Sequence, residues 1–242
     1  MHTTIKHTLR RAPLAVLASA QIPNSFDYVV RSVIGDSLLI TRDRDGQAHV
    51  FLNYCRHRGA MPACGAGNSR KFTCPYHAWV YDNKGRLKGV PGAAGFEAID
   101  RDEYGLVELP NEERHGFIWA VLTAGAEIDL DAHLGPMNAE LARWNYQDFG
   151  YHDERSLTSE VSWKGALEAF AEGYHFPFVH GQSIIGRSTL ANTHAYDEFG
   201  DHHRIAVELL AGGRAVLQRV LGAVRDLVDA SKVPLIVANA GR

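Results

Sequence analysis

The sequence predicts an α+β protein, with an antiparallel-β domain first and a domain of mixed helices and strands after it. Short β-rich runs separated by turn dipeptides fill residues 26–119, a pattern typical of antiparallel strands. After residue 123, apolar side chains instead recur at helical spacing. The chain has 242 residues, 45% of them hydrophobic, which suffices for two such domains. We therefore expect an N-terminal segment over 1–20, a β domain over 21–125 and an α+β domain over 126–242.

Three β-rich runs open the first domain, in FDYVVRSVIGDSLLITRDRDGQAHVFLNY (26–54). They are separated by Gly35-Asp36 and Asp45-Gly46, which are favourable turn dipeptides because glycine adopts positive φ without strain. The segment WVYDNKGRLKGVP (79–91) predicts a hairpin, and GFIWAVL (116–122) predicts a further buried strand. The first domain is thus expected to be almost entirely β.

Helical patterns mark the second domain. The segment DLDAHLGPMNAELARW (129–144) predicts a loop and then a short helix, and 151–161 has the composition of a strand. A helix is expected to begin in SWKGALEAFAEGYHFPFVHG (162–181) and to break at Pro177, which lacks the N–H that a helix needs. The segment RAVLQRVLGAVRDLVDA (214–230) predicts an amphipathic helix.

Composition excludes several classes of protein. The net charge is −3 with both signs interspersed, so the chain lacks the basic surface expected for nucleic acid or an anionic membrane. The segment LRRAPLAVLASAQ (9–21) resembles an export signal, but its apolar run is short and contains Pro13. Three cysteines do not form a disulfide framework. We expect a reduced, cytoplasmic protein that does not enter a membrane.

Two of the three cysteines stand beside histidines, as Cys55-x-His57 and Cys74-x2-His77. Chance pairing of small buried cysteines with surface histidines is one interpretation. A structural zinc site has the right ligand types, but zinc loops usually space their ligands by two to four residues, and Cys-x-His is tighter. The third interpretation is a Rieske [2Fe–2S] cluster, in which two histidines replace two cysteines on one iron. One Cys and one His per loop suit this cluster.

The residues around the two Cys-His pairs also favour the Rieske cluster. Four of them would let backbone amides approach inorganic sulfide: Gly59, Gly65, Gly67 and Pro75. Trp79 and Tyr81 can shield the cluster from water. The segments CRHRGA, CPYHAW and YDNKGRLKGVP resemble the Rieske domain of the Rieske non-haem iron oxygenases, the family that includes the α subunits of aromatic-ring-hydroxylating dioxygenases. Ala78 departs from this family, which commonly has glycine there, and we expect a small effect.

The resemblance implies which residues hold the cluster. Cys55 and Cys74 would bind one iron, and His57 and His77 the other. Cys64 lies between the loops with no pairing role, and we expect it to be a packed free thiol.

A second set of chemical groups follows in EAFAEGYHFPFVHG (168–181). Glu172 and His175 are three residues apart and share a helical face, whereas His180 lies about 140° away on a regular helix. Because Pro177 breaks the helix, His180 can return to the side of His175. The alternative is an amphipathic aromatic helix with incidental histidines.

Joined to the Rieske pattern, WKGALEAFAEGYHFPFVH looks like the iron-binding helix of the same family. The resemblance implies that His175 and His180 bind a mononuclear Fe(II) in a 2-His-1-carboxylate triad. It also implies that Glu172 is a bridging acid, which contacts His77 of a neighbouring subunit.

The third iron ligand is not identified by the sequence. In the family it is a carboxylate from a late helix of a longer, helix-grip-like catalytic domain, and only 62 residues follow His180 here. The chain therefore resembles a family member that is short at both ends, with a partial catalytic domain. The remaining acids rank below the histidines: Asp197, Glu198 and Asp201 in an expected loop, and Asp226 and Asp229 in the expected late helix. We expect the mononuclear iron to be weakly held or absent.

The resemblance implies the terminal oxygenase component of a Rieske system. Electrons would come from NAD(P)H through a separate flavin-containing reductase, with or without a ferredoxin, since the chain has no nucleotide-binding fingerprint. O₂ would be used to hydroxylate or oxidatively demethylate a small organic substrate. A homotrimer or an α3β3 assembly is implied. The alternative functions are a Rieske electron-transfer protein and an inactive fragment.

Overall fold

The structure is a computed structural model that describes residues 8–95, 99–154, 156, 160–183, 186 and 189–209. Its described residues separate into two compact units. The first unit lies within Met1–His133 and Leu141–Tyr151, and the second within Leu134–Glu140 and His152–Arg242. Antiparallel sheets with a few helices make the fold α+β, as expected. The expected domain boundaries near residues 20 and 125 stay predictions.

The largest sheet of the first unit is built from the three predicted β-rich runs. They form β2 (Asp27–Val33), β3 (Asp36–Arg42) and β4 (Ala48–Leu52), and β5 (Ala66–Asn68) joins them in the order β4-β3-β2-β5. All neighbours are antiparallel. The two predicted turn dipeptides close the hairpins, because consecutive strands joined by tight turns must pair antiparallel.

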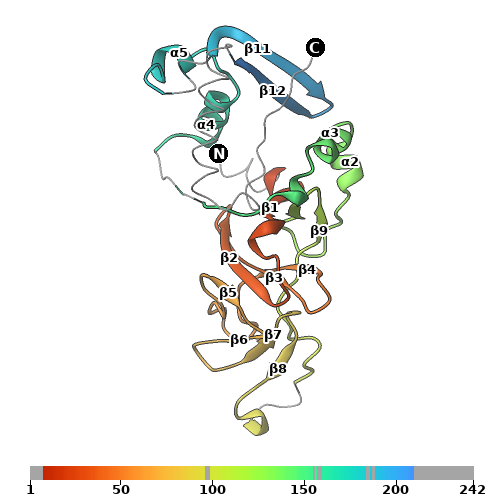
Figure 1. The fold of residues 1–242 in the computed structure, drawn as a ribbon. Coiled ribbons are helices and arrows are strands. Elements are labelled where there is room, and N and C mark those ends of the chain that lie inside the picture. Colours follow the sequence, from red (N-terminus) through yellow and green to blue (C-terminus); the bar gives the residue numbers. More distant parts are fainter. Residues whose placement is uncertain are drawn as a thin grey trace. The chain divides into compact units, whose positions relative to one another are not determined.

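The predicted hairpin forms part of a second, smaller sheet. Its strands are β6 (Lys71–Thr73), β7 (Val80–Asp82) and β8 (Leu87–Gly89), in that order. Figure 1 shows these three strands together at one end of the first unit. Strand β7 therefore follows the second Cys-His pair directly, and β8 returns along it.

The third sheet pairs distant parts of the chain. Strand β1 (Leu14–Ala18) lies beside β10 (Phe117–Ala120), which pairs in turn with β9 (Asn111–Arg114). Strand β10 was predicted. Strand β1 falls in the segment expected to stand apart from the β domain, yet its residue Leu14 pairs with Ala120.

Two hydrophobic cores hold the first unit together. One lies between the β1-β10 pair and the large sheet, and its fully buried residues include Ile22, Leu38, Ile40, Val50, Ile118 and Ala120. The other lies around the Cys-His loops and contains Leu39, Phe51, Cys55, Phe72, Cys74, Trp79, Tyr81 and Leu87. Both predicted cluster cysteines thus belong to the packed interior.

Helices begin after the third sheet. These are α2 (Leu130–Leu134) and α3 (Met137–Trp144), in the segment where one short helix was predicted. Short 3₁₀ turns also occur among the described residues, at Ser19–Gln21, Ala93–Gly95 and Tyr146–Asp148.

The predicted broken helix is two helices. Helix α4 (Trp163–Phe170) begins at Ser162, whose hydroxyl accepts the N–H of Gly165 at 3.1 Å. It ends before Glu172, so the break precedes Pro177, contrary to the prediction. Pro177 instead lies in the first turn of α5 (Phe176–Val179), where its missing N–H costs nothing.

A hairpin completes the described part of the second unit. Strands β11 (Thr189–Phe199) and β12 (His202–Leu209) pair antiparallel, and α5 lies next to β11. The described residues of 151–161 form no strand, unlike the prediction. The amphipathic helix predicted over 214–230 lies outside the described residues.

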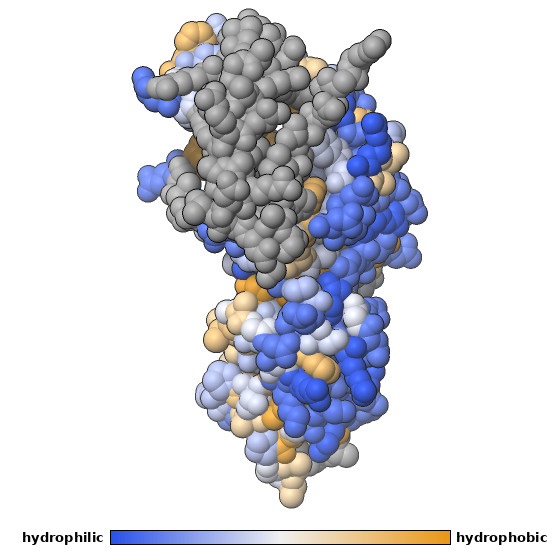
Figure 2. Space-filling view, in the orientation of Figure 1, coloured by the Kyte–Doolittle hydropathy of each residue, from blue (hydrophilic) through white to orange (hydrophobic). Residues whose placement is uncertain are grey.

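Hydrophilic side chains dominate the described surface in the view of Figure 2, and the apolar ones are scattered between them. Among the described residues, no helix has the length and apolar character needed to cross a membrane.

Candidate iron centres

The first Cys-His pair lies in a tight turn after β4. The backbone N–H of Cys55 donates to the carbonyl of Ala60 at 2.9 Å, and the N–H of Gly59 donates to the carbonyl of Cys55 at 2.8 Å. Gly59 has φ +73°, a conformation that only glycine adopts without strain. These two hydrogen bonds close the turn that carries the side chains of residues 55 and 57.

The second pair lies in a turn with the same frame. Cys74 donates to the carbonyl of Trp79 at 2.8 Å and accepts from the N–H of Ala78 at 3.0 Å. Ala78 has φ +53°, so it occupies the position that Gly59 occupies in the first turn. A left-handed alanine costs ~1–2 kcal/mol relative to unstrained backbone. The expectation that the departure from glycine has a small effect stays a prediction, and this backbone conformation argues for a larger one.

The two turns place their cysteines inside and their histidines near the surface. Cys55 and Cys74 are 4% and 2% exposed, and neither forms a disulfide. His57 is half-buried and His77 is exposed. Thiolates in a packed core are unfavourable unless a cation or hydrogen-bond donors compensate their charge. A bound iron centre would supply that compensation.

A tyrosine hydroxyl completes the surroundings of the first thiol. The Oη of Tyr81 lies 3.2 Å from the Sγ of Cys55 and accepts the N–H of Arg56 at 3.0 Å. Because Oη already accepts from Arg56, its own proton is available to the sulfur. Burial and the neighbouring thiol raise the pKa of Tyr81 well above its usual range, so the proton stays on the hydroxyl.

The two imidazole rings lie together at the exposed end of this core. Their centroids are 4.5 Å apart, and the ring of His57 stacks on Trp79 at 5.0 Å while that of His77 stacks on Tyr76 at 4.0 Å. Partial burial and the nearby positive charges of His77 and Arg58 lower the pKa of His57. A lowered pKa favours the neutral ring, which is the form that binds metal.

This arrangement fits a Rieske [2Fe–2S] cluster better than a zinc ion. Tetrahedral zinc needs four protein ligands around one ion. Within the described ranges, no three Cys, His, Asp or Glu side chains converge in that way. In a [2Fe–2S] cluster each iron takes only two protein ligands, and bridging sulfide separates the two pairs.

The second predicted centre lies around α5. His175 precedes this helix and His180 follows it, and their ring centroids are 5.3 Å apart. One turn of helix therefore brings the two rings together, as the sequence predicted, although the break lies earlier. The first turn of α5 includes Pro177, which fits there because its N–H is not needed.

Glu172 contacts His175 within the same turn of chain. Its carboxylate accepts the backbone N–H of His175 at 3.3 Å and pairs with Nδ1 of the same residue. The hydrogen bond from His175 lowers the pKa of Glu172, which keeps the carboxylate ionised. Nδ1 is then the donor, and Nε2 remains as the basic nitrogen of the ring. A carboxylate in this role fixes the tautomer and orientation of a metal-binding histidine.

Two of the other acids considered from the sequence lie in a strand instead of the expected loop. Asp197 and Glu198 lie in β11 rather than in a loop, and Asp201 lies in the turn to β12. Asp197 pairs with Arg204 at 2.5 Å. Asp226 and Asp229 lie outside the described residues. The contact expected between Glu172 and His77 stays a prediction.

Cys64 is a free thiol, as expected, but it is exposed rather than packed. Sequence reasoning also missed the role of the Tyr81 hydroxyl, which was interpreted only as shielding. The alternation of side chains along a strand could have revealed it. Trp79 and Tyr81 are two residues apart, so both face the cysteine loops.

Two family models match this chain, one over each of the segments that contain the candidate centres. Residues 12–101 match the Rieske [2Fe-2S] domain, and residues 145–226 match the catalytic domain of ring hydroxylating alpha subunits. The chain thus joins an iron–sulfur domain to an oxygenase domain. It belongs to the family of Rieske non-haem iron oxygenases, as a chain of the alpha-subunit type. The cofactors of such a chain are a Rieske [2Fe–2S] cluster and a mononuclear iron.

Curated relatives differ in what they act on. The chain is 34% identical to the biphenyl 2,3-dioxygenase subunit alpha of Rhodococcus jostii (strain RHA1), over 64% of this chain and 35% of that protein. It is 29% identical to the carnitine monooxygenase oxygenase subunit of Escherichia coli (strain K12), over 67% of this chain and 44% of that protein. The chain spans less than half the length of these relatives.

Solved structures share the fold. Naphthalene 1,2-dioxygenase with indole bound matches with a TM-score of 0.68 at 28% identity, over 78% of this chain and 44% of that one. The quaternary ammonium Rieske monooxygenase CntA, in complex with L-carnitine, matches with a TM-score of 0.77. Its identity is 22%, over 85% of this chain and 58% of that one, so this likeness concerns the fold alone.

Proposed function

We propose that the chain acts in a terminal oxygenase component, which receives electrons from a reductase and uses O₂ to hydroxylate or oxidatively demethylate an organic substrate. One observation carries the proposal. Two turns with the same backbone frame hold two buried free thiols and two imidazoles 4.5 Å apart, upstream of a second histidine pair. When bound, the cluster would supply electron transfer and the mononuclear iron would supply O₂ activation.

The first centre is assigned by its burial and contacts. Cys55 and Cys74 would hold the inner iron, because their thiols lie in the core. His57 and His77 would hold the outer iron, because their rings meet at its exposed end. The hydroxyl of Tyr81 would stabilise negative charge on the sulfur of Cys55.

The second centre is assigned by ring geometry. His175 and His180 would be the two imidazole ligands of the mononuclear iron, with Glu172 orienting His175 through Nδ1. We keep Glu172 as the acid that bridges the two centres across subunits. Its carboxylate is ionised and half-exposed, so it has room for a second hydrogen bond.

The names of the relatives support the proposed substrates and partners. Their names include biphenyl and naphthalene dioxygenases, an N,N-dimethyl phenylurea N-demethylase and a carnitine monooxygenase, so both hydroxylation and demethylation are represented. One solved relative is named for inter-subunit electron transfer, which favours a homotrimer or an α3β3 assembly here. We propose a flavin-containing NAD(P)H reductase as the electron donor, with or without a ferredoxin, and a cytoplasmic location.

Anaerobic reconstitution with iron and sulfide tests the proposal. The full chain should take up two inorganic sulfides and show the visible and electron paramagnetic resonance (EPR) spectra of a Rieske cluster, and excess Fe(II) should add a third iron. O₂ uptake with a reductase and a panel of aromatic and N-methyl substrates then tests the oxygenase. A colourless, zinc-loaded protein would contradict the first centre. A cluster without a third iron under excess Fe(II) would favour an electron carrier.

A further inference from the structure

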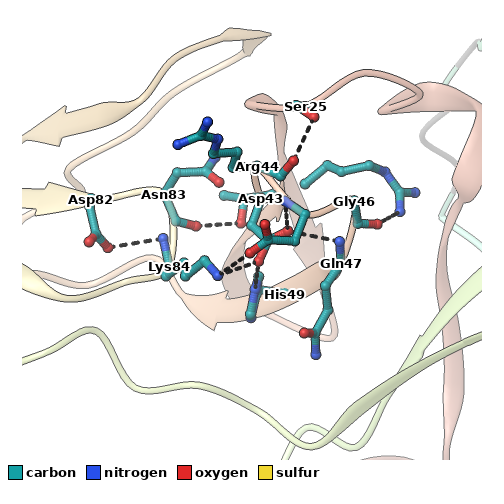
Figure 3. Close-up of polar contacts among 12 residues, drawn as sticks. Ser25, Asp43, Arg44, Gly46, Gln47, His49, Asp82, Asn83 and Lys84 are labelled. Atoms are coloured by element: carbon teal, nitrogen blue, oxygen red, sulfur yellow. Dashed lines mark hydrogen bonds and ion pairs between the residues drawn. The ribbon is translucent and has the colours of Figure 1, made fainter.

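Asp43 is a buried carboxylate in the turn between β3 and β4. Its side chain is 1% exposed. One carboxylate oxygen accepts the backbone N–H groups of Asp45 and Gln47, each at 2.8 Å. Figure 3 shows the contact with Gln47. The carboxylate therefore fixes the turn that leads into β4.

The other oxygen of Asp43 contacts two basic side chains from different elements. The Nζ of Lys84 lies 2.8 Å away and Nε2 of His49 lies 3.3 Å away (Figure 3). Burial alone would raise the pKa of Asp43, but the hydrogen bonds from Lys84, from His49 and from the turn hold it well below its usual range. Asp43 is therefore ionised, and its negative charge stabilises the protonated forms of Lys84 and His49.

His49 lies between two carboxylates. Its Nδ1 is 2.7 Å from Oε1 of Glu108, on the side opposite Asp43, and its ring stacks on Phe51. Burial lowers the pKa of His49, but the hydrogen bonds to Glu108 and Asp43 outweigh burial and raise it. Lys84 contacts Asp43 in this group and also pairs with the exposed Asp45. His49 thus carries charge over a wider pH range than a solvated histidine.

The partners of Asp43 belong to the two elements that flank the cysteine loops. His49 lies in β4, which runs directly into the turn at Cys55. Lys84 lies in the tight turn after β7, the strand that leaves the turn at Cys74. Asp43 therefore joins the chain entering the first loop to the chain leaving the second.

Two further contacts hold the turn at Lys84 against the large sheet. The hydroxyl of Thr41 donates to the carbonyl of Asn83 at 2.8 Å. Gly85 has φ +73°, and a Cβ there would lie 2.5 Å from the ring of Phe51. Phe51 packs in the same core as the two proposed cluster cysteines. A shift of this turn would therefore displace side chains around the cluster site.

We propose that Asp43 is a positioning residue for the Rieske cluster, which aligns the two cysteine loops by holding His49 and Lys84 on one carboxylate. This inference rests on the proposed function, because it takes these loops to carry the cluster. A buried ion pair that supports only general stability is the competing explanation.

The test compares two carboxylates that share Lys84. Asp43→Asn keeps an acceptor for the turn amides but removes the charge, whereas Asp45→Asn removes a carboxylate that is 72% exposed. Clusters are reconstituted in both full-length variants, and their loss to a chelator is followed by visible absorbance. We expect loss to be at least ~10-fold faster in Asp43→Asn, because a neutral amide loses the charge-assisted contacts with Lys84 and His49 that join the two loops. Asp45→Asn should stay within about twofold of wild type, since exposed pairs contribute little.

A spectroscopic readout separates positioning from stability. The EPR g-values of the reduced cluster should shift or broaden in Asp43→Asn, at a temperature where the variant is fully folded. If Asp43→Asn does not fold, Lys84→Met removes the same contact from a half-exposed position and should give the same two effects.

The pH dependence provides a third readout. A histidine with a raised folded pKa contributes stability that is complete below about pH 6.5 and is lost as the pH rises through the folded value. Cluster loss from wild type should therefore accelerate over that window, and His49→Gln should abolish the step.

Each possible result decides a different claim. Wild-type loss rates and g-values in both Asp43→Asn and Lys84→Met would overturn the inference, as would equal effects of the Asp43 and Asp45 variants. A wild-type chain that takes up no cluster would instead overturn the proposed function.

Discussion

The hydroxyl oxygen of Tyr81 lies 3.2 Å from the sulfur of Cys55 and accepts the backbone N–H of Arg56 at 3.0 Å. The proton of Tyr81 is therefore directed at a proposed cluster ligand. A hydrogen bond to thiolate stabilises the more negative, reduced form of the cluster more than the oxidised form.

We predict that Tyr81→Phe keeps the cluster but lowers its reduction potential by a few tens of millivolts, since ~1 kcal/mol of differential hydrogen-bond energy is ~40 mV for one electron. Protein-film voltammetry of the reconstituted chain measures this. Tyr76→Phe is the matched control, because Tyr76 is 60% exposed and stacks on His77, a proposed cluster ligand. An unchanged potential in Tyr81→Phe would show that the hydroxyl does not act on the cluster.

Cys55→Ser and Cys74→Ser should abolish the cluster and destabilise the β domain, because the bound metal links two turns that otherwise lack a covalent tie. The visible spectrum and thermal unfolding of the reconstituted proteins report both effects. Cys64→Ser is the control, since Cys64 is exposed and should leave the spectrum unchanged. Loss of the spectrum in the Cys64 variant would mean that the ligands are misassigned.

Ala78→Gly should stabilise the chain by ~0.5–1 kcal/mol, because it removes the strain of φ +53° while adding some freedom to the unfolded chain. Urea unfolding of the cluster-free protein measures the free energy. The reciprocal change Gly59→Ala should destabilise the matching turn by a similar amount. A destabilised Ala78→Gly would imply that the methyl group makes contacts that outweigh the backbone strain.

Glu172→Gln should take up the cluster and the iron to the same extent as wild type but slow electron delivery about tenfold or more, since the amide orients His175 less strongly and carries no charge for a bridging contact. Stopped-flow reoxidation of the reduced cluster, with the natural reductase and substrate, measures the rate. Glu168→Gln, on exposed helix one turn earlier, provides the control. Wild-type rates in the Glu172 variant would remove this residue from the electron path.

The mononuclear iron is predicted to be weakly held. His175 and His180 would supply two ligands, and among the described residues no third Cys, His, Asp or Glu side chain joins them in a group that could hold a metal ion. Iron counting after desalting should therefore give about two irons per reconstituted chain rather than three. Retention of a third iron would contradict this prediction, and alanine variants of the five candidate acids would then identify its carboxylate ligand.

Local sequence patterns predicted the parts of this fold in which segments close in sequence pair with one another. Turn dipeptides and runs of β-forming residues were enough to predict β2, β3, β4 and the β7-β8 hairpin, because each strand pairs with the next one along the chain. The pairing of Leu14 with Ala120 could not be predicted in this way, since nothing local links residues so distant in sequence.

In the candidate site, too, the features set by local sequence were predicted, and those that depend on distant residues were not. The Cys-His spacing marked the proposed cluster ligands, and the helix pattern marked the histidine pair. The position of the helix break was wrong because Pro177 was taken as a terminator, whereas proline also begins helices. The network around Asp43 was not predicted, since its members come from three turns and strands that only the folded chain brings together.

The two cysteine turns close over the same span, although their histidines stand at different intervals from the cysteine. In each turn the left-handed residue follows the cysteine by four positions and donates its N–H back to it. The second turn has one more residue between its cysteine and His77, yet the distance in sequence from the cysteine to the left-handed residue is the same. A search rule based on the cysteine and its left-handed partner would therefore recognise both loops at once, whereas one based on cysteine and histidine needs two separate patterns.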